Sequence, residues 1–136
     1  EAGDIALYAR AGDVVTEVDR VHGFADAAEA LFSPDGSTLL VSQVEPNTVA
    51  VFDVENGTLA PGNPAAITGI GLAEQMDVVA RGATAGLVVV ASTDVDGTAN
   101  VHLLQVGQTP GAAADLGRVA LGTASTDIPT AIALQP

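Results

Sequence analysis

The chain has 136 residues, 48% of them hydrophobic, and no cysteine. It is long enough for one domain with a core, and it excludes a disulfide framework or a thiolate metal site. Its 17 acidic residues face only four basic ones, all arginine, which gives a formal net charge of −13 and excludes the clustered cationic surface that nucleic acid requires.

No apolar run approaches the roughly 18 residues of a membrane-spanning helix. No basic stretch precedes an apolar one, as it would in a signal sequence. We therefore expect no membrane span. The acidic surplus suits a solvated surface in a saline or extracellular setting, so we expect an exported protein, extracellular or periplasmic.

The first predicted elements in chain order are two short strands, Ile5 to Tyr8 and Val14 to Val21, followed by an apolar strand that ends at Phe32. The segment Ser33-Pro34-Asp35-Gly36 then predicts a turn, because Pro presets the first φ angle and Gly accepts the positive φ that closes it. A second apolar strand follows from Thr38 to Gln43. These elements begin an antiparallel meander.

The meander continues with a strand from Asn47 to Phe52 that runs into the hairpin turn Asn56-Gly57, and with an outer strand from Ala65 to Gly69. The same order then recurs. The predicted strands of the later copies are Ala73 to Val78, Leu87 to Thr93, Val101 to Leu104, Leu116 to Leu121 and Ile128 to Gln135. The residues 94–97, Asp-Val-Asp-Gly, predict a hairpin turn and do not match a calcium-binding EF-hand loop.

Three copies of one strand set the period of the repeat. Ile5, Val49 and Val101 begin these copies and lie 44 and 52 residues apart, and Tyr8, Phe52 and Leu104 are equivalent within them. A period between the ~40–45 residues of WD repeats and the ~50 of kelch repeats is typical of propeller blades. A β-sandwich, the alternative, has no reason to repeat every fourth strand.

We therefore predict an all-β fold of propeller blades, each a four-stranded antiparallel meander, in an incomplete ring. Residues 1–136 form a single propeller segment, with blade parts at 1–25, 26–70, 71–124 and 125–136. Six blades of about 45 residues need about 270 residues, so we expect a segment of a larger propeller. Its predicted partners are further blades, either from the parent chain or from partner protomers.

Two families of propellers resemble this sequence. The Ser33-Pro34-Asp35-Gly36 turn and the strand Asn47-Thr48-Val49 resemble the lactonase-like propellers with YVTN-type repeats. The stretches 73–78 and 91–94 resemble the secreted β-propeller phytases, although the phosphate-binding Arg of that motif is missing here. The first resemblance implies a lactonase-type hydrolase, and the second implies part of a Ca²⁺-dependent phytase-like phosphatase.

Four acidic residues are candidate metal ligands. Glu29 and Glu74 begin the innermost strands of successive repeats, with Asp26 and Asp77 nearby. Carboxylates that converge at a channel mouth would bind Ca²⁺, a cation that takes oxygen ligands. The alternative is that the two glutamates hydrogen-bond neighbouring backbone.

No catalytic residues are assigned by the sequence. His22 and His102 lack the context of a nucleophile and are predicted to lie on strand faces or the surface. Arg20 and Arg81 are candidate ligands for an anion, with ion pairs to the surplus carboxylates as the alternative. The predicted function is therefore a binding or assembly module within a larger propeller, and the phosphatase and the lactonase remain alternatives.

Overall fold

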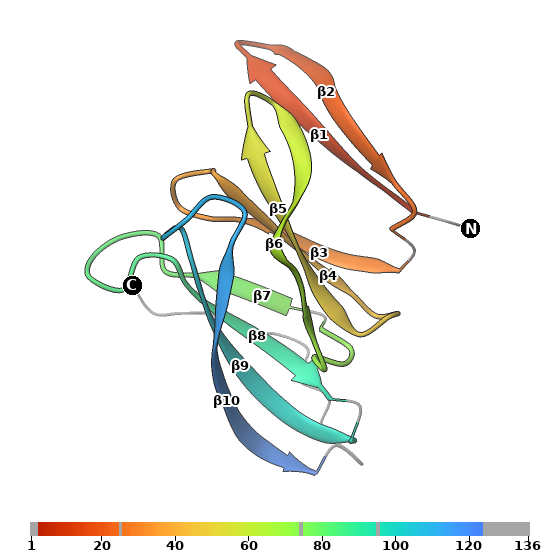
Figure 1. Cartoon of the computed structure of the whole chain (residues 1–136), viewed down its shortest axis with the longest axis vertical. Helices are drawn as coiled ribbons and strands as arrows, with labels where there is room; N and C mark the ends of the chain where they lie inside the picture. The colour runs from red at the N-terminus through yellow and green to blue at the C-terminus, as the bar shows by residue number, and fades with distance from the viewer. Residues whose placement is uncertain (1–2, 25, 74, 95, 124–136) are drawn as a thin grey trace.

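The computed structural model describes residues 3–24, 26–73, 75–94 and 96–123 (Figure 1). Every regular element among them is a β-strand. The strands are β1 (Asp4–Ala11), β2 (Val14–His22), β3 (Ala27–Phe32), β4 (Thr38–Gln43), β5 (Thr48–Glu55), β6 (Thr58–Thr68), β7 (Gln75–Val78), β8 (Leu87–Thr93), β9 (Thr98–Val106) and β10 (Ala113–Thr123). In this part of the chain there is no helix that is long and apolar enough to span a membrane.

The strands form three antiparallel sheets, each a meander in which sequence neighbours pair. Sheet I contains β1 and β2, sheet II contains β3 to β6 in order, and sheet III contains β7 to β10 in order. The all-β class and the four-stranded antiparallel meanders are as predicted. The sheets follow one another along the molecule, and sheet I lies next to sheet II at the N-terminal end (Figure 1).

The Ser33-Pro34-Asp35-Gly36 turn joins β3 to β4 as predicted. Gly36 adopts a φ of 74°, and its N–H donates to the carbonyl of Ser33 at 2.9 Å. The Asp35 carboxylate accepts hydrogen bonds from the Ser33 hydroxyl at 2.6 Å and from the Ser37 N–H at 3.1 Å. These bonds lower the pKa of Asp35. The turn is thus fixed by its own side chains.

The outer strands are longer than predicted. β6 begins at Thr58, not at Ala65, because Asn56 and Gly57 have positive φ angles of 53° and 80° and form a two-residue hairpin turn. The chain therefore returns along β5 at once. β10 likewise begins at Ala113, before the predicted Leu116. The strand predicted at 128–135 lies outside the described residues.

Two apolar cores join the three sheets. The first lies between sheets I and II and contains Ile5, Leu39, Val41, Ala50, Phe52 and Leu59. The second lies between sheets II and III and contains Leu40, Val49, Val51, Ile67, Ile70, Ala73, Met76, Val88, Val90, Leu104, Val106 and Ala113. Sheet II supplies residues to both cores, so it is the middle layer of the stack.

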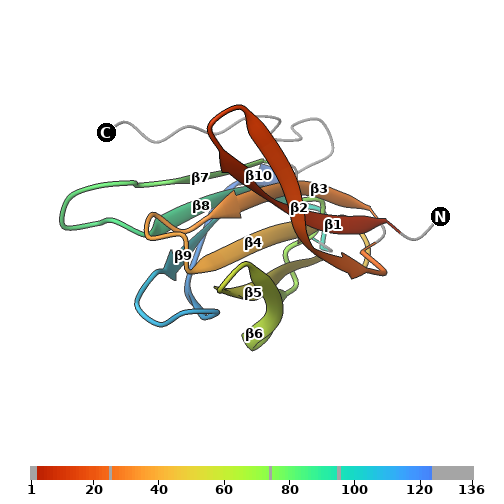
Figure 2. The same ribbon diagram turned by 90° about the horizontal axis from the view of Figure 1, so that it is seen from above.

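Strand alternation explains how one sheet serves two cores. Along β5, Val49 and Val51 face sheet III, whereas Ala50 and Phe52 face sheet I. Phe52 is 1% exposed, and its ring lies 5.1 Å from that of Phe24. Ile5 in β1 faces sheet II just as Val49 in β5 faces sheet III, in agreement with their predicted equivalence. Seen from above, the hairpin of sheet I crosses over sheet II (Figure 2).

Candidate active site

A buried carboxylate organises one end of sheet III. Asp94 follows β8 in the turn that leads to β9, and it is 4% exposed. The turn is closed by the N–H of Gly97, which donates to the carbonyl of Asp94 at 2.8 Å. The hairpin predicted at 94–97 is confirmed in its strands and its position. Its first residue, however, also has a role that the sequence did not reveal.

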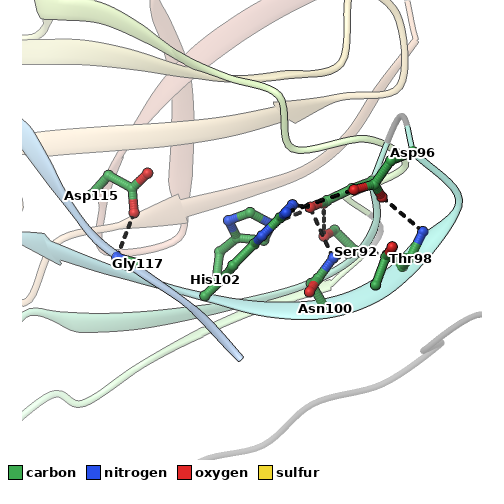
Figure 3. Close-up of polar contacts among 9 residues, drawn as sticks. Ser92, Asp96, Thr98, Asn100, His102, Asp115 and Gly117 are labelled. Atoms are coloured by element: carbon green, nitrogen blue, oxygen red, sulfur yellow. Dashed lines mark hydrogen bonds and ion pairs between the residues drawn. The ribbon is translucent and has the colours of Figure 1, made fainter. Parts of the chain in front are cut away.

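Four side chains donate to Asp94. Ser92 Oγ lies 2.8 Å and His102 Nε2 lies 2.9 Å from Oδ1. Asn100 Nδ2 lies 2.9 Å from Oδ2, which also accepts a hydrogen bond from Arg118 Nη1. Figure 3 shows these side chains converging from β8, β9 and β10. We call Asp94, Ser92, Asn100, His102 and Arg118 the Asp94 cluster.

The hydrogen bonds decide the charge state of Asp94. Burial by itself disfavours the carboxylate, but the bonds from Ser92 and His102 and the positive charge of Arg118 outweigh it and lower the pKa of Asp94. An ionised carboxylate only accepts hydrogen bonds, so Nε2 of His102 carries a proton. His102 itself is buried, so this nitrogen is committed to Asp94.

Arg118 is the exposed member of the Asp94 cluster. Its side chain is 49% exposed, and Nη2 lies 3.6 Å from Oδ2 of Asp96. Arg118 lies opposite His102 in the pairing of β10 with β9, which places both side chains on the same face of sheet III. The guanidinium is therefore oriented by two carboxylates while half of it faces solvent.

Glu29 lies in β3, at the corresponding end of sheet II. It is opposite Ser42, near the end of β4, just as Ser92 lies near the end of β8. The Glu29 carboxylate accepts a hydrogen bond from the backbone N–H of Met76 in β7, so it bridges sheets II and III. Burial raises the pKa of Glu29, the bond from Met76 opposes this, and the nearby charge of Asp77 adds to the rise.

The pairing register corrects one predicted equivalence. Glu29 lies opposite Ser42, and Ser42 lies opposite Val49. The residue in the same relation to Val101 is Gln75, which lies opposite Ala91. The residue equivalent to Glu29 is therefore Gln75 and not Glu74, which lies outside the described residues. A bulge between Ala27 and Glu29 breaks the alternation on which the prediction rested.

The predicted calcium ligands do not form a group among the described residues. Asp77 Oδ1 accepts a hydrogen bond from the N–H of Val78 at 2.8 Å, and Asp26 is exposed with a φ of 56°. No three His, Asp or Glu side chains within the described ranges are arranged to hold a metal ion. Calcium binding by Glu29, Glu74, Asp26 and Asp77 stays a prediction.

The two arginines predicted to bind an anion have different surroundings. Arg20 in β2 donates to Glu17 at 2.6 Å and to Asp4 at 3.1 Å, and these two carboxylates raise its pKa. His22 lies 2.9 Å from Asp4. The ion pairs that the sequence offered as an alternative are therefore present at Arg20. Arg81 is exposed in the segment between β7 and β8.

Sequence reasoning missed the Asp94 cluster, although part of its signal was present. Ser92 and Asp94 are two residues apart, as are Asn100 and His102. Side chains two apart on a strand share a face, so each pair pointed to one face of a predicted hairpin. Arg118 could not be added without the register of β10, which contains a bulge between Asp115 and Gly117.

No family model matches the chain, and no curated protein matches its sequence. Two solved structures resemble it, both of proteins named putative 6-phosphogluconolactonases. The protein from Bacteroides fragilis superimposes with a TM-score of 0.69 at 18% identity, over 89% of this chain and 34% of its own. The protein from Bacteroides uniformis superimposes with a TM-score of 0.70 at 17% identity, over 95% of this chain and 36% of its own.

These likenesses establish the fold. The chain is part of a β-propeller of the lactonase-like type, and it spans about a third of the length of these two proteins. Sheets II and III are four-stranded blades, and sheet I contains two strands. Since the identities are 17% and 18%, any activity has to be argued from the residues of this chain.

Proposed function

We propose that this chain forms part of a lactonase-type hydrolase, with Arg118 as the residue that binds an anionic sugar lactone. The observation that carries the proposal is the state of Arg118, which is held by buried Asp94 and keeps half of its side chain exposed. The two similar structures support the reaction class through their names, and 6-phosphogluconolactone is the substrate those names suggest.

Opening a lactone requires stabilisation of the charge that develops on the carbonyl oxygen and a base that activates water. A fixed guanidinium serves the first need, or it binds the phosphate of a phosphorylated sugar through paired N–H donors. Because Asp94 and Asp96 already hold Arg118, little side-chain entropy is lost when a ligand binds. His102 is not the base, since its Nε2 is committed to Asp94.

Glu29 is the candidate base. It is half-buried, it lies at the same end of the sheets as Asp94, and its pKa is raised by burial and by the charge of Asp77. A carboxylate with a raised pKa is a better proton acceptor than one at its ordinary value. The inner strand also carries the side chains that line the channel of a propeller, where a substrate enters.

Binding of the product 6-phosphogluconate, measured by titration calorimetry, tests the proposal on the chain as it exists. We expect binding that weakens at least tenfold in Arg118→Gln and is unchanged in Arg81→Gln, an exposed arginine outside the Asp94 cluster. Circular dichroism of each variant verifies the fold. Absence of binding at millimolar product, or equal losses in both variants, would contradict the proposal.

A further inference from the structure

Sheet I is half of the unit that sheets II and III complete. β1 is equivalent to β5 and β9, since Ile5 packs toward the following sheet as Val49 does. In sheets II and III, two further strands pair beyond the equivalent strand, β4 with β3 and β8 with β7. The two positions that sheet I leaves open therefore lie along the edge of β1 that faces away from β2.

The backbone groups at this edge are identified by the pairing of β1 with β2. The carbonyl of Gly3 accepts hydrogen bonds from the N–H groups of Gly23 and Phe24 at 3.1 and 2.8 Å, so Gly3 faces β2. Alternation then turns Ile5 toward β2 and turns the N–H and C=O groups of Asp4 and Ala6 outward. In agreement, the N–H of Arg20, opposite Ala6, donates to Asp19 and not to β1.

A groove runs along this edge. It has a volume of about 260 Å³ and lies between β1 and the start of sheet II. Its lining is mostly small and apolar. The lining residues are Asp4, Ile5, Ala6, Ala27, Ala28, Glu29, Ala30 and Val41. Alanines leave room for the larger aliphatic side chains of a neighbouring strand.

An exposed aromatic residue on the same face shows what is uncovered. Phe32 lies opposite Leu39 in sheet II and is 43% exposed. In sheet III the equivalent pair is Val78 and Val88, and both pack against the core shared with sheet II. The face of β3 that carries Phe32 lacks the cover that sheet II gives to β7.

We propose that the free edge of β1 and this groove bind an extended β-hairpin from polypeptide outside residues 1–136, which completes sheet I as a four-stranded blade. Its second strand pairs antiparallel with β1, in the manner of β4 and β8. These two strands, TLLVSQ and LVVVAST, are buried along almost their whole lengths and give the chemistry of the partner: apolar, β-branched and uncharged.

The observations favour this source over a second copy of the chain. Within the described residues, every inner strand is already paired inside sheet II or sheet III, so a second copy has no inner hairpin to offer without unfolding. The similar propellers, by contrast, are about three times as long as this chain. Polypeptide of that length supplies the two strands easily.

The test uses a peptide that copies residues 27–43, the β3–β4 hairpin, added to the whole chain. Hydrogen exchange followed by NMR reports on the amides of Asp4 and Ala6. We expect at least tenfold slower exchange at both when the peptide is bound. Ala6→Pro removes an outward N–H that β2 does not use, so sheet I persists and peptide binding weakens at least tenfold. Ala6→Ser keeps the N–H and serves as the matched control.

Three results would overturn the proposal. One is protection that appears at β10 and not at β1, and another is equal peptide affinity in the Pro and Ser variants. The third is self-association of the wild-type chain in sedimentation that Ala6→Pro abolishes, since the occupant would then be a second copy. If Ala6→Pro does not fold, the exchange of Asp4 and Ala6 in the wild-type chain decides alone.

Discussion

The hydroxyl of Thr38 accepts a hydrogen bond from the backbone N–H of Gly111 at 3.0 Å, across the interface of sheets II and III. Thr38 is fully buried, and the two residues are 73 positions apart. Gly111 also lies directly against Asp53 in β5. The link between β9 and β10 is therefore packed onto the edge of the neighbouring sheet, and this close approach requires a residue without a side chain.

Gly111→Ala is expected to lower the free energy of unfolding by about 2–3 kcal/mol, because overpacking and a disfavoured backbone conformation add. A Cβ atom at this position would lie 2.6 Å from Cβ and 3.0 Å from Cα of Asp53, and the φ of Gly111 is +65°. Urea denaturation followed by circular dichroism measures the change.

Gly12→Ala is the matched control. Gly12 has nearly the same φ, +62°, but a Cβ atom there meets nothing within 4 Å. Its cost should be the backbone term alone, about 1 kcal/mol. Equal losses in the two variants would show that the contact with Asp53 contributes nothing.

Asp94→Asn should destabilise the fold at pH 7 by about 3 kcal/mol, the loss typical of removing one member of a buried ionic group. One of the two acceptor oxygens becomes an NH₂ group that faces donors such as Arg118 and His102. Asp96→Asn, at an exposed position of the same turn, should have a small effect. Urea midpoints of the two variants give the comparison.

The pH dependence of this effect follows from the lowered pKa of Asp94. In the unfolded chain the carboxyl titrates near 3.8, and in the fold it titrates below that value. Its contribution is therefore present above pH 3.8 and is lost as the pH falls through the folded pKa. The gap between the wild-type chain and Asp94→Asn should narrow below about pH 4. A gap that stays constant to pH 2 would contradict the assignment.

The sequence predicted the meanders because their determinants are local. Alternating apolar residues and the Ser33–Gly36 and Asn56-Gly57 turns fix which strands pair, and the structure has those pairs. The register is less local. A bulge between Ala27 and Glu29 reverses which face the following residues occupy, and no residue type announces it. The equivalence of Glu29 with Glu74 was therefore wrong by one residue.

The Asp94 cluster required tertiary information. Arg118 is 24 positions from Asp94, and the two meet only because the turn after β8 folds back and β10 pairs with β9 in one particular register. The sequence shows a carboxylate and an arginine among 17 acidic and four basic residues. Which of the many carboxylates each arginine contacts depends on sheet geometry.

Asp19 should hold sheet I to sheet II. Its Oδ2 accepts a hydrogen bond from the N–H of Leu59 at 2.6 Å, and Oδ1 accepts one from the N–H of Arg20 at 2.8 Å. Asp19→Ala leaves the half-buried Leu59 amide without a partner and is expected to cost about 1–3 kcal/mol. Amide exchange in β1 and β2 should rise more than in sheet III, and a uniform rise would contradict this role. Asp13→Ala, an exposed residue of the β1–β2 turn, is the control.

Glu29→Gln is expected to leave the fold at least as stable at pH 7 as the wild-type chain. Gln keeps a carbonyl oxygen that accepts from the N–H of Met76, and it removes a charge that burial disfavours. Because the folded pKa of Glu29 is raised above its unfolded value of 4.5, the contribution of this group is fully present below pH 4.5 and is lost as the pH rises through the folded pKa.

The stability of the wild-type chain relative to Glu29→Gln should therefore fall as the pH rises above 4.5. Glu29→Ala is the contrasting variant, because it leaves the buried Met76 amide unpaired and should lose about 1–3 kcal/mol at every pH. Urea midpoints from pH 4 to 8 measure both. If Glu29 is also the base that activates water, Glu29→Gln abolishes lactone hydrolysis while the fold persists, and that combination separates a catalytic carboxylate from one that only joins two sheets.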